Sequence, residues 1–175
     1  MRKEKLQELK KYIEELKVVA QIKEAKSFFI TSIPYTFKLN NGAYIKREQV
    51  LKNNNDGSAV IVIPLTIDNE ILMVVEPRVF TAKTVSVSFP SGYLEEGESP
   101  YEAALRELKE ETGYIPKYIK LLDSFYQDEG CSRAFNHIFI AFNCTCKSTQ
   151  NLDEGEIIRY MTFNLKDLDK LEQMG

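Results

Sequence analysis

The sequence contains little of what builds a disulfide framework or a zinc site. It has three cysteines and a single histidine among its 175 residues, which argues against both kinds of site. Cys144 and Cys146 stand two residues apart and are predicted to be a pair at the end of a strand rather than a ligand set. His137 lies in an apolar, strand-like run, and we expect it to be a hydrogen-bonded strand histidine rather than a catalytic one.

Long apolar runs and a surplus of basic residues are also absent. No apolar stretch approaches the length of a membrane span, and the lysine-rich start lacks the apolar region of a signal peptide. The net charge of −3 gives no reason to expect nucleic-acid or membrane binding. A chain of this length without internal repeats is expected to form one domain with a buried core. We expect a cytoplasmic protein.

What the sequence does contain is an unusual acidic stretch at residues 92–114, which reads GYLEEGESPYEAALRELKEETGY. A helix is predicted to start after Ser99, with Pro100 at the first helical position and Glu102 completing a capping box. Thr112 and Gly113 mark its end, because glycine readily takes the left-handed conformation of a C-terminal cap. The predicted helix spans about three turns.

This helix is predicted to have an acidic face beside a core face. At roughly 100° per residue, Glu107, Glu110 and Glu111 fall in one sector, where their mutual repulsion costs about 0.2–0.5 kcal/mol per pair. A bound cation would remove that cost, and magnesium commonly bridges carboxylates to substrate phosphates. A solvated acidic face is the alternative, but the upstream glycine turn, Glu98 and the helix caps favour a metal site. The adjacent sector suits packing against a sheet and comprises Tyr101, Ala104, Leu105 and Leu108.

At every fixed position the stretch fits the Nudix box, G-x5-E-x7-R-E-U-x-E-E-x-G-U, in which U is a bulky apolar residue. Tyr114 fills the last position, where an aliphatic residue is commoner. The chain therefore resembles the Nudix hydrolases. The resemblance implies hydrolysis of a nucleoside diphosphate linked to another moiety, a small-molecule nucleotide substrate, with Mg²⁺ or Mn²⁺ as cofactor.

The resemblance also implies a role for each charged residue of the box. The principal metal ligands are Glu110 and Glu111, supported by Glu107. Arg106 is expected to orient a neighbouring glutamate through a salt bridge, and Glu98 is either that structural partner or a further ligand. The main-chain carbonyl of Ser91 is at a position that is a frequent further ligand in this family. The implied metal ligands are therefore Ser91, Glu98, Glu107, Glu110 and Glu111.

Three short segments outside the helix, EPR, FPSGY and QDEG, resemble the ADP-ribose pyrophosphatase branch of the family. In that branch an arginine after the first central strand contacts phosphate or ribose, which implies that Arg78 binds substrate. Two departures weaken the choice of substrate. Glu129-Gly130 stands where the branch has a proline–glycine turn, and Ser91 replaces a usual alanine. Other nucleoside diphosphate sugars therefore remain alternatives to ADP-ribose.

Hydrolysis would also benefit from a general base, which contributes about 10²–10⁴-fold. In the resembling branch this role is often assigned to a glutamate on a late loop, and Asp153-Glu154-Gly155-Glu156 is the acidic loop at that place. Glu156 is favoured over Glu154 because it directly precedes the next predicted strand, with ordinary solvated loop charge as the alternative. The implied catalytic residues are Glu111, Glu156 and Glu154.

A function from a different class is a catalytically silent Nudix-fold module that senses a nucleotide metabolite or mediates interactions. Such a module is expected to have lost metal ligands of the box. This chain retains all of them, and so the enzyme is favoured.

Residues 1–57 are predicted to form an N-terminal extension. A helix rich in lysine and glutamate is expected from about residue 2 to 26, with a narrow apolar stripe that packs on this subunit or, as we favour, at an interface or domain edge. Strands at 28–33 and 43–51 form a hairpin, and Pro34 breaks or bends the first of them. The extension is expected to cap the catalytic domain or to form a homodimer.

Residues 58–175 are predicted to form the catalytic domain. Strands outnumber helices, which suits an α/β fold of the Nudix type, an α/β/α sandwich in which helices flank a mixed sheet. The chain stops in what reads as the start of a helix and turn, and so a truncated C-terminus is expected. The predicted elements besides the acidic helix are strands at 59–65, 71–75, 118–126, 134–142 and 157–163 and a helix at 165–174.

Overall fold

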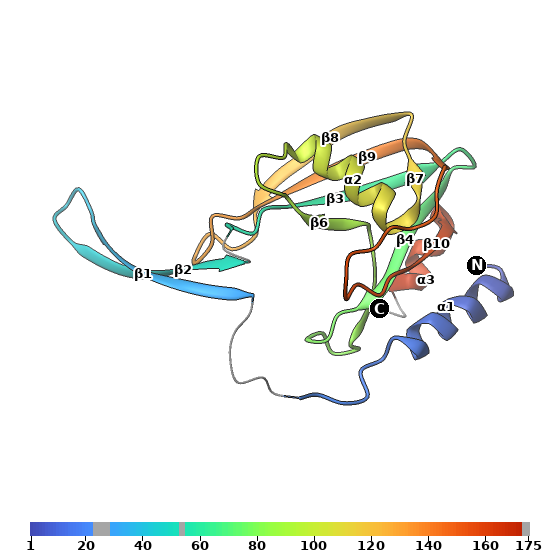
Figure 1. The fold of residues 1–175 in the computed structure, drawn as a ribbon, viewed down its shortest axis with the longest axis horizontal. Helices are drawn as coiled ribbons and strands as arrows, with labels where there is room; N and C mark the ends of the chain where they lie inside the picture. Colours follow the sequence, from blue (N-terminus) through green and yellow to red (C-terminus); the bar gives the residue numbers. More distant parts are fainter. Residues whose placement is uncertain (23–28, 53–54, 173–175) are drawn as a thin grey trace.

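The computed structural model describes residues 1–22, 29–52 and 55–172, and its centre is a mixed β-sheet (Figure 1). In the described chain the strand order is β10-β4-β3-β9-β7, with β5 beside β4, β6 beside β3 and β8 beside β9. β3 and β9 are parallel, whereas their other neighbours pair antiparallel. The strands are β3 (Ala59–Thr66), β4 (Glu70–Pro77), β5 (Val85–Ser88), β6 (Ser91–Tyr93), β7 (Tyr114–Ile115), β8 (Tyr118–Tyr126), β9 (Phe135–Cys146) and β10 (Arg159–Asn164).

Helices cover both faces of this sheet, which confirms the predicted α/β fold. Successive side chains of a strand point to opposite faces, and in β4 Leu72 packs beneath α2 (Pro100–Thr112). Its neighbours Ile71 and Met73 belong to a second core with α1 (Lys3–Glu15) and α3 (Leu168–Glu172). A short 3₁₀ turn, η1 (Leu165–Asp167), leads into α3. The sheet is thus held between α2 on one side and the chain's first and last helices on the other.

The apolar stripe of α1 packs on the chain's own sheet. Leu9 is fully buried in the core with β4 and β10, and the Lys5 ammonium reaches the Glu70 carboxylate at 2.9 Å and the Thr162 carbonyl at 2.6 Å. The helix ends at Glu15, well before the predicted end at about residue 26. Residues 23–26 of the predicted helix lie outside the described residues. The β-branched pair Val18-Val19 follows after Leu16 and Lys17, and β-branched residues are poorer helix formers.

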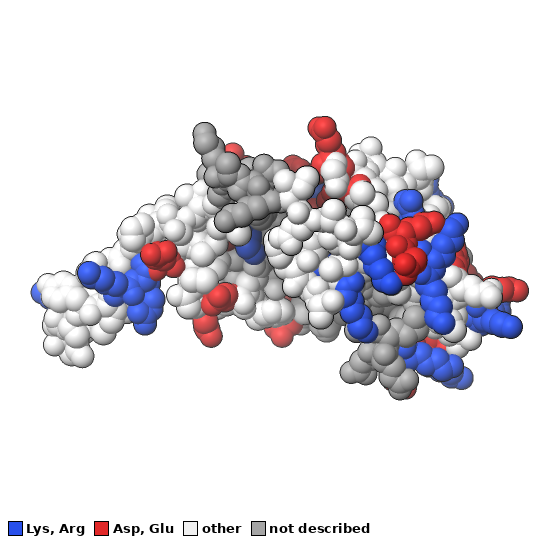
Figure 2. Space-filling model, turned by 90° about the horizontal axis from the view of Figure 1, so that it is seen from below, with Lys and Arg blue, Asp and Glu red and all other residues white. Residues whose placement is uncertain are grey.

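The predicted hairpin forms a separate two-stranded sheet that projects from the body (Figure 1). β1 (Ile30–Lys38) and β2 (Tyr44–Lys52) pair antiparallel along their full length, and Gly42 takes a φ of 85° in the turn between them. Pro34 neither breaks the strand nor ends it, because both strands of a two-stranded sheet are edges, where proline is tolerated. Uncharged side chains cover much of this projection (Figure 2).

Several elements differ in length from the prediction. β9 continues past residue 142 to Cys146, so that Cys144 and Cys146 do lie at a strand end. The His137 ring is hydrogen-bonded to the Ser124 hydroxyl at 2.9 Å, as expected for a strand histidine. The short strands β5, β6 and β7 were not predicted, because two to four residues are too few for a periodic pattern. In the described chain, the helices are too short or too polar to cross a membrane.

Candidate active site

The acidic stretch forms α2 with the predicted caps at both ends. Ser99 accepts a hydrogen bond from the Glu102 amide at 3.3 Å, and the Glu102 carboxylate accepts from the Ser99 amide at 3.0 Å. Gly113 takes a left-handed φ of 76°. A Cβ added there would overlap the carbonyl oxygen of Ser148, so that only glycine fits. The helix that carries the box glutamates therefore begins and ends at fixed points.

Arg106 forms salt bridges with three carboxylates of the Nudix box. Its guanidinium contacts Glu98 at 2.8 and 2.9 Å, Glu107 at 2.8 Å and Glu110 at 3.0 Å, and it also donates to the Tyr93 carbonyl at 3.0 Å. The contact with Arg106 lowers the pKa of Glu98. Of the two roles considered for Glu98, the structure shows the salt bridge.

Glu111 is the box carboxylate that receives the least compensation. Its side chain is 3% exposed and accepts a hydrogen bond from the Ser91 amide at 3.2 Å. Among the described residues, no lysine or arginine forms a salt bridge with it. Burial, and then repulsion by Glu107 and Glu76, raises the pKa of Glu111 to about 9. Burial also raises the pKa of Glu107 to about 7, although Arg106 opposes the shift.

We expect these raised pKa values to make the metal-free protein less stable as the pH rises. Both carboxyl groups bind their protons more tightly in the folded chain than in the unfolded chain, where their pKa is near the ordinary value of 4.5. Their contribution is therefore complete below about pH 4.5 and is lost as the pH rises through about 7 and 9. In EDTA, Tm should fall by about 5 °C or more between pH 5 and 9, since about 1 kcal/mol shifts Tm by 2–4 °C at this size. Differential scanning fluorimetry measures this, and Glu111→Gln should reduce the slope; an unchanged slope would contradict the assignment.

Gly92 is required by the carboxylate that lies against it. A Cβ added at this position would overlap the Glu107 carboxylate, and Gly92 pairs with Val60 of the central strand β3, so that its backbone is held in place. The first glycine of the box thus leaves the space in which Glu107 lies.

We expect Gly92→Ala to displace Glu107 and to lower the catalytic rate by roughly 10- to 100-fold, the order that a 1 Å misplacement can cost. Steady-state kinetics would measure the loss. Gly42→Ala is the control, because it strains a left-handed backbone position at the hairpin tip, far along the chain from the box. Equal losses of rate in the two variants would mean that general destabilisation, rather than the displaced carboxylate, is responsible.

A pocket of about 1080 Å³ opens beside these glutamates. Glu107, Glu111 and Arg106 line it together with Ser91, Gly92 and Tyr93 of β6. Seven carboxylate side chains line the pocket against three cationic ones, Lys52, Arg78 and Arg106. Carboxyl groups therefore outnumber cationic groups in the lining of this pocket.

Glu76 is a site residue that the sequence analysis missed. It lies in β4, is 8% exposed, and faces the pocket close enough to Glu111 to raise that residue's pKa. The Arg78 guanidinium contacts its carboxylate at 2.7 Å, and the Ser88 hydroxyl donates to it at 3.1 Å. Arg78, the predicted substrate-binding residue, is half exposed at the pocket. A charged residue directly after the apolar run of β4 was the signal that could have identified Glu76.

The acidic loop before β10 reaches the pocket through only some of its residues. Asp153 and Glu156 line the pocket, whereas Glu154 is exposed and does not. Glu156 lies close enough to Glu107 and Glu111 to raise the pKa of both. A turn presents it: the Asp153 amide donates to the Glu156 carboxylate at 3.1 Å, and the Glu156 amide donates to the Asp153 carbonyl at 3.1 Å.

Residues at the base of the hairpin also line the pocket, a role that the sequence analysis did not assign to them. The Phe29 and Tyr93 rings lie 5.9 Å apart. The Lys52 ammonium lies 5.4 Å from the centre of the Tyr93 ring and donates to the side-chain amide oxygen of Gln127 at 2.7 Å. The Gln127 amide in turn donates to the Asn136 side chain at 2.9 Å. Aromatic rings, the Lys52 ammonium and neutral amides therefore line the pocket as well as the carboxylates.

The donor set fits a hard divalent cation. Among the residues that the structure describes, no three or more His, Cys, Asp or Glu side chains already converge as a metal cage, and Arg106 holds three of the glutamates. Even so, Glu107 and Glu111 are buried carboxyl groups with raised pKa values, in a pocket where carboxyl groups outnumber cationic ones. Carboxylate oxygens are the ligands that Mg²⁺ takes, often as only one or two of its partners.

The comparisons with known proteins agree with this arrangement. The NUDIX domain model matches residues 56–175, and the chain belongs to the Nudix family; it is a Nudix hydrolase. It is 37% identical over 135 residues to the ADP-ribose pyrophosphatase of Bacillus subtilis (strain 168), covering 77% of this chain and 70% of that protein. It is also 37% identical over 131 residues to the methanol dehydrogenase activator of Bacillus methanolicus, covering 74% and 68%. A crystal structure of an ADP compounds hydrolase superposes with a TM-score of 0.69 at 25% identity, covering 86% of this chain and 78% of that one.

Proposed function

We propose that this Nudix pyrophosphatase cleaves the pyrophosphate bond of ADP-ribose or a related nucleoside diphosphate sugar, with Mg²⁺ or Mn²⁺. The observation that carries the proposal is the pocket in which buried Glu107 and Glu111 meet Glu156 and Arg78. It is supported by the similarity to an ADP-ribose pyrophosphatase over 77% of the chain. The pocket is also large enough for a nucleotide, since ligand sites are commonly about 300–1000 Å³.

The residues would divide the work by their positions. The metal is assigned to Glu107, Glu110 and Glu111 with the Ser91 carbonyl, while Glu98 acts through Arg106. When bound, it supplies charge neutralisation on the phosphates and lowers the pKa of a bound water. Arg78, held by Glu76 at 2.7 Å, orients a phosphate or ribose oxygen.

Glu156 is proposed to take the proton from the attacking water. It is the glutamate of the acidic loop that lines the pocket, and it lies on the same side as Glu107 and Glu111. A carboxylate in that place can accept the proton as the water attacks phosphorus. Cationic groups would then stabilise the negative charge on the leaving phosphate.

A phosphate-release assay across candidate substrates tests the proposed function. The protein is incubated with ADP-ribose, other nucleoside diphosphate sugars and dinucleoside polyphosphates, with Mg²⁺ or Mn²⁺, and a phosphatase converts the products to inorganic phosphate for malachite-green detection. We expect ADP-ribose or another nucleoside diphosphate sugar to give the highest kcat/KM. Inactivity on the whole panel with both metals would instead support the catalytically silent module.

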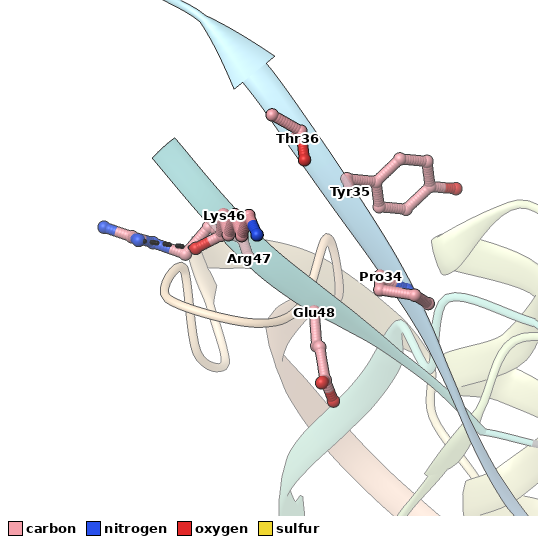
Figure 3. Close-up of a pocket in the computed structure, with 6 residues that line it drawn as sticks. All are labelled: Pro34, Tyr35, Thr36, Lys46, Arg47 and Glu48. Carbon is pink, nitrogen blue, oxygen red and sulfur yellow. Dashed lines mark hydrogen bonds between the residues drawn. The ribbon is translucent and has the colours of Figure 1, made fainter. Parts of the chain in front are cut away.

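We further propose that residues 1–57 are an extension of the catalytic domain, residues 58–175, and that its hairpin joins two copies of the chain. A two-stranded hairpin alone is marginal in water, yet β1 and β2 expose Tyr35, Phe37 and Tyr44. Pro34, Tyr35 and Thr36 of β1 face a shallow hollow shared with Lys46, Arg47 and Glu48 of β2 (Figure 3). Light scattering after size exclusion should give twice the 20.2 kDa chain mass; a monomer at every concentration would contradict the dimer.

A further inference from the structure

The connection between β9 and β10, residues 147–158, is fastened to the C-terminal end of α2 (the orange-red segment in Figure 1). The Lys147 and Ser148 amides donate to the Gly113 carbonyl at 2.9 and 3.2 Å. The Asn151 amide donates to the Glu110 carbonyl at 2.8 Å. These main-chain bonds attach the first part of the connection to the turn of α2 that carries the box glutamates.

The far end of the connection is tied back by one side chain. The Gln150 amide nitrogen donates to the Glu111 carbonyl at 2.5 Å and to the Ile158 carbonyl at 3.2 Å. Ile158 is buried directly before β10. Gln150 therefore joins the α2 turn that carries Glu111 to the residue at which the loop ends. In the described part of the chain, Gln150 is the side chain whose hydrogen bonds join the Glu111 carbonyl to the Ile158 carbonyl.

The segment enclosed by this bridge, residues 151–157, is the part of the connection that enters the pocket. It carries Asp153 and Glu156, both of which line the pocket, and it turns at Gly155 with a φ of 91°. Within the segment, Asp153 and Glu156 bind each other through the two hydrogen bonds described above. Both of these bonds lie within the turn, whereas the hydrogen bonds to α2 and its C-terminal cap come from residues 147–151.

We propose that Gln150 is a positioning residue, which holds the Glu156 loop against the α2 turn so that Glu156 stays in register with Glu111. This inference rests on the proposed function, in which Glu156 accepts a proton beside the Glu111 site. Both ends of the loop meet at one amide group, and so loss of that amide removes the hydrogen bonds that join Ile158, near Glu156, to the Glu111 carbonyl. A misplacement of about 1 Å at a reacting group can cost as much as 10² in rate.

A double-mutant cycle tests this role. Gln150→Met has nearly the same length but cannot donate, and we expect it to lower kcat by roughly 10- to 100-fold while KM changes by less than about threefold. In a Glu156→Gln background the same substitution should have almost no further effect on kcat, because residues that act as a unit are not additive. Gln7→Met, at an exposed glutamine of α1, is the matched control and should retain the parent rate.

Hydrogen exchange separates the bridge from the chemistry. Amides of residues 151–158 should exchange faster in Gln150→Met, while those in the first turns of α2 are unchanged. If the parent enzyme were inactive on every substrate, the proposed function would fall, and the exchange result would still decide whether Gln150 holds the loop. Should Gln150→Met not fold, Gln150→Asn, which keeps the amide but shortens its reach, replaces it in both measurements.

Three results would overturn the proposal. The first is an unchanged kcat in Gln150→Met, and the second is the same loss of kcat in the parent and Glu156→Gln backgrounds. In the second case the glutamine would act independently of Glu156. The third is unchanged exchange of the loop amides, which would mean that the main-chain bonds to Gly113 and Glu110 are sufficient.

Discussion

Glu111→Gln should lower kcat on the preferred nucleotide substrate by about 10²–10⁴-fold. A bound metal contributes several kcal/mol of charge stabilisation, and each 1.4 kcal/mol corresponds to a factor of ten in rate. Glutamine keeps the shape of the side chain and can still accept from the Ser91 amide, the 3.2 Å contact of the parent. It removes the charge on which a divalent cation depends, and so the loss should appear with both Mg²⁺ and Mn²⁺.

The fold should survive this substitution, which separates a metal role from a structural one. Glu111 is buried beside Glu107 and Glu76, and so a neutral isostere should leave Tm in EDTA unchanged or raised at pH 8. The control is Glu14→Gln, an exposed glutamate paired with Lys17 on α1, which should keep the parent rate. If Glu111→Gln turned over at the parent rate, its assignment as a metal ligand would be wrong.

Glu156→Gln should lower kcat by about 10²–10⁴-fold, the usual contribution of a general base. The neutral amide cannot take the proton of the attacking water, although it can accept the hydrogen bond that the Asp153 amide donates at 3.1 Å. KM should change little, because the residue is assigned to the reacting water rather than to the substrate. Rates measured from pH 5 to 9 with saturating metal give the comparison.

Glu154→Gln is the matched control for that result, since it makes the same chemical change two residues away on the same loop. Glu154 is exposed and does not line the pocket, and so we expect a change in kcat of less than about threefold. The reverse order, with the larger loss in Glu154→Gln, would move the base to Glu154. Equal small losses would leave neither residue as the base.

Local sequence rules were sufficient for α2, the helix that carries Glu107, Glu110 and Glu111. The capping box at Ser99 and Glu102 and the left-handed Gly113 appear as predicted, because each depends on residues no more than three or four positions apart. The central strand β3 and the hairpin turn at Gly42 also follow from short-range patterns. The predicted end of α1 was wrong because it was taken from the apolar stripe, and that pattern does not indicate where β-branched residues end a helix.

The sequence predicted a salt bridge from Arg106 to a neighbouring glutamate, but not the full set of carboxylates that meet at the site. Arg106 contacts Glu98, Glu107 and Glu110 at the same time. The sequence allowed Glu98 to be either a salt-bridge partner of Arg106 or a metal ligand, and the structure shows the salt bridge. Glu76 is 22 to 35 residues from these groups in sequence, and the packing of α2 on the sheet that contains β4 brings it close to Glu111. Contacts of this kind depend on which elements become neighbours.

The sequence by itself determined the residues of the box, the helix that carries them and the family to which the chain belongs, because those features are local in the chain. Tertiary structure alone decided which carboxylates are neutralised and which are buried without compensation. It also selected Glu156 over Glu154 as the glutamate that lines the pocket and placed Gln150 between Glu111 and Ile158. Burial and charge pairing are properties of neighbours in space, and the folded sheet is what makes residues 76, 111 and 156 neighbours.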